Sequence, residues 1–349
     1  MSTAAAAVAM NGPGVDRRER VVRFIAQAAG ASHVEVSRWE RLSGGAIQEN
    51  IALDVRVEGG ALAGEHRWVV RTDASSAVSV SHTRPEEFAL LVAAHAAGVK
   101  VPRPLWLCDD GAGPAFFVMA RVPGIAAGHR LVKDDALVPD RPLLARELGE
   151  NLARVHGIAP PRPALDFLGE VPDDPACERV AAYRANLDAL GAAGVNPVLE
   201  WGLRWCELHA PAPWPAALLH RDYRTGNYLV HEGRLAAVLD WEFAGWGDPR
   251  EDIGWMFARC WRFGRGERVA GGVGMARDFL EGYARVSGRT IDAAATRYWQ
   301  VMAHIRWAVI ALQQAQRHRS GAESSLELAL TAHIVPELEW EILELTQPA

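Results

Sequence analysis

The chain has 349 residues, enough for two domains or for the two lobes of one enzyme. About half of the residues (49%) are hydrophobic, which permits a sizeable core, and the formal net charge of −6 argues against a general nucleic-acid binder. No apolar run approaches the roughly 20 residues of a membrane span, so we expect no membrane partner. The four cysteines show no metal-binding spacing, which is typical of a reduced, cytoplasmic protein.

The N-terminal third predicts a tail, a helix and a set of strands. Residues 1–15 are alanine-rich without the basic segment of a signal peptide, so we expect a flexible tail. Residues 16–30 predict an amphipathic helix. Strand-like runs over 34–42, 47–57 and 67–72, separated by glycine-containing turns, indicate an antiparallel meander.

Two features of this region are suited to phosphate binding. The turn Ser43-Gly44-Gly45 lets the backbone approach a phosphate, but it matches neither a Walker A nor a GxGxxG pattern, so a plain hairpin remains the alternative. Arg71 ends the third strand and is either a surface residue or a bidentate phosphate ligand. Residues 84–98 then predict a helix, whose first turn holds Glu86 and Glu87, where the helix dipole favours acids.

The pattern changes from strands to helices near residue 124. Two apolar strands form a second predicted hairpin, which ends at Met119-Ala120-Arg121-Val122 and leads into Pro123-Gly124. Beyond it, apolar residues recur at helical spacing. We expect helices over residues 141–156, 178–190, 198–209, 269–287, 293–318 and 323–345.

Most of the functional information lies in residues 218–246, LLHRDYRTGNYLVHEGRLAAVLDWEFAGW. Asp222 follows a short apolar run, Asn227 comes five residues later, and a predicted hairpin then ends at Asp240. Such a carboxylate, amide and second acid can converge on one spot, although a polar turn beside a hairpin is the alternative. Phosphoryl transfer needs a residue that positions the attacking hydroxyl and oxygen ligands for Mg²⁺, and this set supplies both.

The segment HRDYRTGN, followed by LDWEFAGWGDPREDIGW, resembles the aminoglycoside phosphotransferase and choline kinase-like family, a branch of the protein-kinase-like fold. The resemblance is greatest to bacterial phosphotransferases related to the kinase-like domain of acyl-CoA dehydrogenase fusions. The family usually has glycine at Arg221, where protein kinases have arginine. The resemblance implies an α+β, bilobal fold, with an antiparallel-β N-lobe and one main helix over residues 16–121 and a larger, mostly helical C-lobe over 122–349.

The resemblance also implies roles for individual residues. Asp222 would be the catalytic base, Asn227 and Asp240 would bind Mg²⁺, and Glu242 is a further metal candidate. Asp252 would be structural and would tie the next helix to the catalytic loop. The expected ATP-binding residues are Ser43, Gly44, Gly45, Arg71 with Glu87 (in preference to Glu86) as its partner, and Met119, Ala120 and Val122 at the adenine-binding hinge.

The helical region is expected to form the acceptor pocket. The candidates for its walls are Trp255, Trp261, Trp299 and Trp307, although tryptophans at helical spacing are also typical of a core. Arg259 and Arg262 belong to an arginine-rich segment that would suit an anionic acceptor, such as a carboxylate or a hydroxyacyl compound, or would form a solvated face.

The sequence therefore predicts an ATP- and Mg²⁺-dependent phosphotransferase that moves the γ-phosphate to a hydroxyl of a small molecule. A protein kinase is less favoured, because no activation segment lies between Asp240 and Asp248. A nucleotide-binding regulator without turnover is the other alternative. The sequence does not identify the acceptor. It also leaves open whether the nucleotide is ATP or GTP and whether the protein is a monomer or a homodimer.

Overall fold

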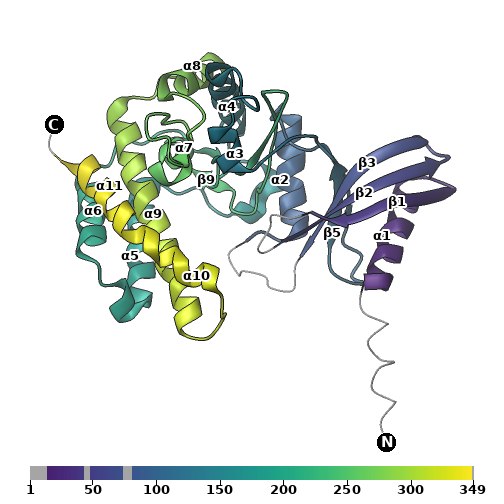
Figure 1. Cartoon of the computed structure of the whole chain (residues 1–349), viewed down its shortest axis with the longest axis horizontal. Helices are drawn as coiled ribbons and strands as arrows, with labels where there is room; N and C mark the ends of the chain where they lie inside the picture. Colours follow the sequence, from purple (N-terminus) through teal and green to yellow (C-terminus); the bar gives the residue numbers. More distant parts are fainter. Residues whose placement is uncertain (1–13, 43–47, 74–80, 348–349) are drawn as a thin grey trace, which may run out of the picture. The chain divides into compact units, whose positions relative to one another are not determined.

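The computed structural model describes residues 14–42, 48–73 and 81–347 of the chain (Figure 1). The chain divides into two compact units. The first comprises Met1–Ala89 and Pro102–Arg121, and the second comprises Leu90–Val101 and Val122–Ala349. Strands dominate the first unit and helices the second, which confirms the predicted α+β class.

The first unit is built on a five-stranded antiparallel sheet with the strand order β1-β2-β3-β5-β4. The strands are β1 (His33–Arg41), β2 (Gln48–Glu58), β3 (Gly64–Asp73), β4 (Pro104–Cys108) and β5 (Phe116–Ala120). α1 (Gly14–Ala29) packs on this sheet through Val21 and Ile25. Alternate residues of β2, such as Ile51 and Leu53, are buried beneath the helix, as the period-two pattern of a half-buried strand predicts.

The second unit begins within α2 (Arg84–Ala96) and is mostly helical (Figure 1). Its helices are α3 (Gly128–Lys133), α4 (Arg141–Val155), α5 (Pro175–Ala189), α6 (Pro197–Leu208), α7 (Arg250–Phe257), α8 (Ala276–Ser287), α9 (Ala293–Arg319), α10 (Leu326–Thr331) and α11 (Val335–Thr346). Its strands form two pairs, β6 (Ala217–Leu219) with β9 (Gly245–Gly247) and β7 (Tyr228–His231) with β8 (Arg234–Val238).

The long helix α9 lies at the centre of the larger core. Met302 and Ile305 on α9 are buried with Leu203 of α6 and Ile342 of α11. α4 and α8 approach closely at Gly149, where an added Cβ would lie 2.0 Å from the Phe279 carbonyl oxygen. Within the described ranges, none of the helices combines the length and the hydropathy that a membrane crossing requires.

Two helix predictions were wrong in their extent. The helix expected over 269–287 starts only at Ala276, because Gly271 and Gly272 adopt φ values of 56° and 74°, which no right-handed helix accommodates. The helix expected over 323–345 is divided between α10 and α11 by a 3-10 turn. Pro336, which has no N–H to continue the helical hydrogen bonds, lies at the start of α11.

Candidate active site

The loop between β6 and β7 carries the predicted catalytic residues, and Asp252 of α7 fixes its start. Oδ2 of Asp252 accepts a hydrogen bond of 2.7 Å from the His220 N–H, and Oδ1 accepts one of 2.7 Å from the Arg221 N–H. Nε2 of His220 lies 2.8 Å from the Leu239 carbonyl oxygen. Nδ1 of the same ring accepts a hydrogen bond of 3.2 Å from the Asp222 N–H. These bonds require the neutral ring with its proton on Nε2, and burial lowers the pKa of His220 accordingly.

Asp252 has a second layer of support behind the loop. Nε2 of His156 lies 3.2 Å from its carboxylate, and Nδ1 of His156 lies 3.0 Å from the Tyr283 hydroxyl. Burial alone would raise the pKa of the Asp252 carboxyl, but the hydrogen bond and charge of His156, with the N–H of His220, bring it below its ordinary value. Asp252 is therefore an ionised, buried anchor that ties α7 to the catalytic loop.

α7 is itself held against α9 by a close backbone approach. An added Cβ at Gly254 would lie 2.4 Å from the carbonyl carbon and oxygen of Trp299, so only glycine fits here. The helix places Trp255, the next residue, beside Asp222. Its indole Nε1 donates a hydrogen bond of 2.8 Å to Oδ1 of Asp222.

Three side chains donate to the Asp222 carboxylate. Besides the Trp255 indole, Nε of Arg224 donates to Oδ1 at 3.1 Å, and Nδ2 of Asn227 donates to Oδ2. The side chain of Asp222 is 14% exposed. A carboxylate that is oriented from three sides but still reaches the surface is suited to accept a proton from a bound hydroxyl.

The β7–β8 hairpin brings Asn227 and Asp240 together, although 13 positions separate them. Asn227 precedes β7 and Asp240 follows β8 within two residues, and the register pairs Tyr228 with Val238. The Leu239 N–H donates to the Asn227 carbonyl at 2.8 Å. Asp240 has a left-handed φ of 60°, a conformation that is rare outside glycine and is found at functional loops.

This donor set fits a magnesium ion. The amide nitrogen of Asn227 donates to the Asp222 carbonyl oxygen at 3.0 Å and to the Asp222 carboxylate, so its oxygen is the end that remains for a metal. Asp240 supplies a carboxylate, and the buried Glu242 lies two residues further. Among the described residues, no three His, Cys, Asp or Glu side chains gather into a metal site. An amide and a carboxylate nevertheless suffice for Mg²⁺, which retains several waters.

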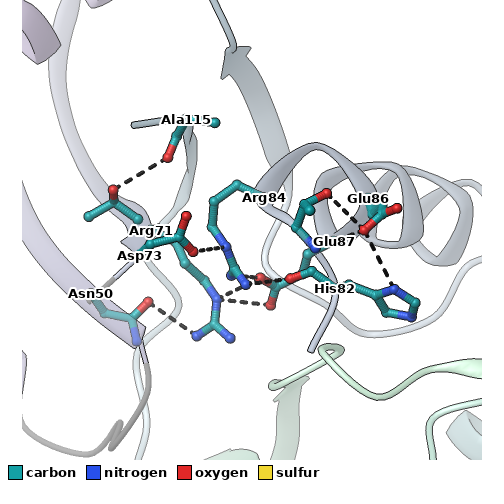
Figure 2. A network of polar contacts seen from close by, with 10 residues as sticks. Asn50, Arg71, Asp73, His82, Arg84, Glu86, Glu87 and Ala115 are labelled. Atoms are coloured by element: carbon teal, nitrogen blue, oxygen red, sulfur yellow. Dashed lines mark hydrogen bonds and ion pairs between the residues drawn. The ribbon is translucent and has the colours of Figure 1, made fainter. Parts of the chain in front are cut away.

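The first unit contains Arg71 and Glu87, the pair that is predicted to lie beside the nucleotide phosphates. Nε of Arg71 lies 2.8 Å from Oε1 and 2.9 Å from Oε2 of Glu87, and both side chains are almost fully buried (Figure 2). Nη1 of Arg71 reaches Oδ1 of Asn50 at 3.5 Å. Glu86 instead accepts the N–H and the hydroxyl of Thr83, both at 2.8 Å, and caps the start of α2. Glu87, and not Glu86, is therefore the partner of Arg71.

The remaining nucleotide candidates are placed as follows. Met119 and Ala120 end β5, where Ala120 pairs with Trp68 and its N–H donates to the Arg103 carbonyl at 2.9 Å. Val122 comes after the strand, at the start of the second unit's main segment. The predicted phosphate loop, Ser43 to Gly45, lies outside the described residues. The roles of these residues stay predictions.

On the acceptor side, Trp255 belongs to a cluster of three indoles. Its ring centroid lies 5.1 Å from that of Trp261 and 6.4 Å from that of Trp307. The guanidinium of Arg224 lies 4.4 Å from the centre of the Trp261 ring, and that of Arg306 lies 4.3 Å from the Trp255 ring. The three tryptophans are thus part of the core, and Trp255 contacts the Asp222 carboxylate. Their role as walls of an acceptor pocket stays a prediction.

The two arginines of the arginine-rich segment contact other groups of the protein. Arg262 donates to the carbonyl oxygens of Gly266 and Phe257, both at 2.7 Å, and Arg259 pairs with Glu341 at 3.2 Å. Whether Arg259 and Arg262 also contact the acceptor stays a prediction. The cation beside the Asp222 carboxylate is Arg224, which sequence reasoning missed although it lies within HRDYRTGN.

Comparison with protein families decides the classification. The model of the phosphotransferase enzyme family matches residues 38–289. The chain belongs to this family. The resemblance drawn from the catalytic segment is thereby confirmed, and members of the phosphotransferase family transfer phosphoryl groups to small molecules.

Acyl-CoA dehydrogenase family member 11 of Rattus norvegicus is a relative with 25% identity to this chain over 302 residues. The matched region covers 81% of this chain and 38% of that protein. The chain spans at most 38% of the length of the acyl-CoA dehydrogenase relatives that it matches.

Solved structures confirm the kinase-like fold. A Ralstonia eutropha protein assigned as an aminoglycoside phosphotransferase has a TM-score of 0.74 at 19% identity, covering 94% of this chain and 98% of that one. A thermostable variant of aminoglycoside phosphotransferase APH(4)-Ia, in ternary complex with AMP-PNP and hygromycin B, has a TM-score of 0.55 at 17% identity, covering 93% and 97%.

Proposed function

We propose that this family member is an ATP- and Mg²⁺-dependent kinase that transfers the γ-phosphoryl group to a hydroxyl of a small molecule. The observation that carries the proposal is the Asp222 carboxylate, oriented by Trp255, Arg224 and Asn227 yet still accessible. The AMP-PNP bound to the APH(4)-Ia variant supports a nucleotide as the phosphoryl donor.

Asp222 accepts the proton of the acceptor hydroxyl as its oxygen attacks the γ-phosphorus. The new P–O bond forms in line with the bond to the leaving ADP, which breaks. Asn227 and Asp240 hold Mg²⁺, with Glu242 as a further candidate, and the ion supplies neutralisation of the phosphate charge. Catalysis therefore comes from positioning and electrostatics, with no covalent intermediate on the protein.

The nucleotide is held from the first unit. Arg71 binds the phosphates, and Glu87 orients it through its Nε. The planar guanidinium of arginine suits the geometry of a phosphate. Ser43, Gly44 and Gly45 are further candidates for holding the phosphates, and Met119, Ala120 and Val122 form the adenine-binding hinge.

The acceptor follows from the charge beside Asp222. The guanidinium of Arg224 touches the carboxylate, and a second guanidinium, from Arg306, stacks on Trp255. Two cations at this position disfavour polycationic acceptors. We place neutral or anionic hydroxyl compounds, including carboxylates and hydroxyacyl compounds, first among the candidate acceptors.

The test is ADP formation from ATP with and without Mg²⁺, across sugars, amino alcohols, aminoglycosides, hydroxy acids and hydroxyacyl-CoA esters. Wild type, Asp222→Asn and the exposed control Asp188→Asn are compared. We expect turnover with one class of acceptor, a loss of about a hundredfold or more in Asp222→Asn, and no change in the control. Equal turnover in all three proteins would remove Asp222 from the mechanism. Nucleotide binding without turnover across the panel would favour the regulator.

A further inference from the structure

A second buried arginine contacts the same carboxylate as Arg71. Arg84, the first residue of α2, has 1% of its surface exposed. Its Nη1 contacts Oε2 of Glu87, its Nε lies 2.9 Å from Oδ1 of Asp73, and its Nη2 donates to the His82 carbonyl oxygen at 2.8 Å (Figure 2). Each of these partners belongs to the first unit, at the end of β3 or the start of α2.

This arrangement divides the charge of Glu87 between two cations. Glu87 is 1% exposed, and the two buried guanidiniums of Arg71 and Arg84 both lie on its carboxylate. The other acid of the network, Asp73, is 47% exposed and therefore well screened by solvent. A lone arginine–glutamate pair would be neutral. The four side chains here also sum to zero, but because solvent screens Asp73, the buried group of Arg71, Arg84 and Glu87 keeps a net positive charge.

Arg84 also fixes the place where α2 begins. It reaches back to Asp73, the last residue of β3, and it holds His82 and Glu87 at the start of the helix. The guanidinium thus connects the two ends of the chain segment between β3 and α2. A buried guanidinium is costly unless it is paired and hydrogen-bonded. Here Glu87 and Asp73 pair with the charge, and the His82 carbonyl oxygen accepts a hydrogen bond.

We infer that Arg84 is a positioning residue for nucleotide binding. It holds Glu87 against Arg71 and shares the negative charge of Glu87, so that Arg71 keeps both a fixed orientation and an effective positive charge toward the phosphates. The inference rests on the proposed function, in which Arg71 binds the nucleotide. It identifies a determinant of nucleotide affinity that does not itself touch the nucleotide.

The experiment measures the affinity for Mg·AMP-PNP by titration calorimetry, together with KM for ATP and kcat. Arg84→Met should weaken AMP-PNP binding about tenfold, the scale of one charge-assisted contact, and raise KM for ATP while kcat changes little. Arg84→Lys keeps the charge and should recover most of the affinity. The matched control Arg20→Met removes an arginine paired with Asp110 in the same unit and should bind AMP-PNP as wild type does.

A double-mutant comparison separates this role from general stabilisation. If Arg84 acts through Glu87, then Glu87→Gln weakens binding, and the addition of Arg84→Met to Glu87→Gln weakens it no further. Affinity of Arg84→Met within twofold of wild type would overturn the inference, as would fully additive losses in the double variant. If Arg84→Met does not fold, Arg84→Gln with thermal unfolding measured in parallel replaces it. Failure of the wild type to bind AMP-PNP would overturn the proposed function itself.

Discussion

The indole N–H of Trp255 donates a hydrogen bond of 2.8 Å to Oδ1 of Asp222, across 33 positions of the chain. Trp255 is 2% exposed and lies on α7, whose first turn also carries the anchor Asp252. One short helix therefore holds both the backbone of the catalytic loop and the side chain of its carboxylate. The orientation of Asp222 depends on the position of α7.

The first prediction concerns Trp255→Phe, which keeps the aromatic packing but removes the N–H donor. We expect kcat to fall about tenfold or more, because a hydrogen bond to a charged group contributes about 1.5–3 kcal/mol. Steady-state kinetics with saturating nucleotide measure the effect. Trp299→Phe is the matched control, since the buried indole of Trp299 makes no hydrogen bond to any residue that the structure describes. Equal kcat values for the two variants would contradict the role of the Trp255 N–H.

The second prediction concerns Arg224, whose guanidinium lies between the Asp222 carboxylate and the face of Trp261. Arg224→Gln removes the cation and should lower kcat/KM about tenfold, a loss of about 1.4 kcal/mol of transition-state stabilisation. Arg224→Lys should retain more activity, but less than wild type, because lysine lacks the planar group that stacks on the indole. If Arg224→Gln matched wild type, Arg224 would be only a surface contact of the loop.

The third prediction concerns the stability supplied by Asp252. Asp252→Asn removes a buried carboxylate that holds two backbone N–H groups and His156, so we expect the free energy of unfolding to fall by about 3 kcal/mol. The folded-state pKa of Asp252 lies below its ordinary value, so its contribution is complete above the unfolded pKa of about 3.9 and is lost as the pH falls through the lower, folded pKa.

Urea unfolding followed by tryptophan fluorescence tests this at pH 7, 5 and 3.5. The difference between wild type and Asp252→Asn should be equal at pH 7 and 5 and smaller at pH 3.5. A difference that does not change with pH would show that Asp252 contributes through packing and not through its charge.

Some of the active site could be predicted from sequence because its geometry is local. Asn227 and Asp240 lie at the two ends of one hairpin, and the turn between its strands determines which residues pair. Asp222 lies five positions before Asn227, a spacing that allows the two side chains to meet, and the Asn227 amide does donate to the Asp222 carboxylate. The strands of the first unit could be predicted equally well, because strand-like runs are separated there by glycine-containing turns.

The supporting contacts could not be predicted, because they join distant segments. His156 and Tyr283 are 127 positions apart, so no local pattern connects either residue with Asp252. Arg84 stands at a helix start, where an arginine is usually exposed; only the folded position of Asp73 and Glu87 explains its burial. Arg259 likewise pairs with Glu341 of α11, a contact that the spacing of the arginine-rich segment does not indicate.

The fourth prediction uses His304, a fully buried histidine of α9. Burial lowers its pKa to about 4, although the hydrogen bond to the Gln300 carbonyl opposes the shift. Between about pH 6.5 and pH 4 the unfolded chain binds a proton at this residue that the folded protein does not, so the free energy of unfolding falls as the pH drops, by about 1.4 kcal/mol per pH unit. His304→Gln should remove this part of the slope in urea unfolding at pH 7, 6 and 5. An unchanged slope would show that another group is responsible.

Phosphoryl transfer to carbon-bound oxygen is the central claim, and ³¹P NMR of the reaction with ATP, Mg²⁺ and the best acceptor tests it most directly. We predict that the γ-phosphate signal is replaced by that of a phosphate monoester of the acceptor, in proportion to the ADP formed. The monoester should be absent without Mg²⁺, and it should form about a hundredfold or more slowly in Asp222→Asn. Appearance of the γ-phosphate as inorganic phosphate alone, or formation of the monoester at the wild-type rate in Asp222→Asn, would contradict the account.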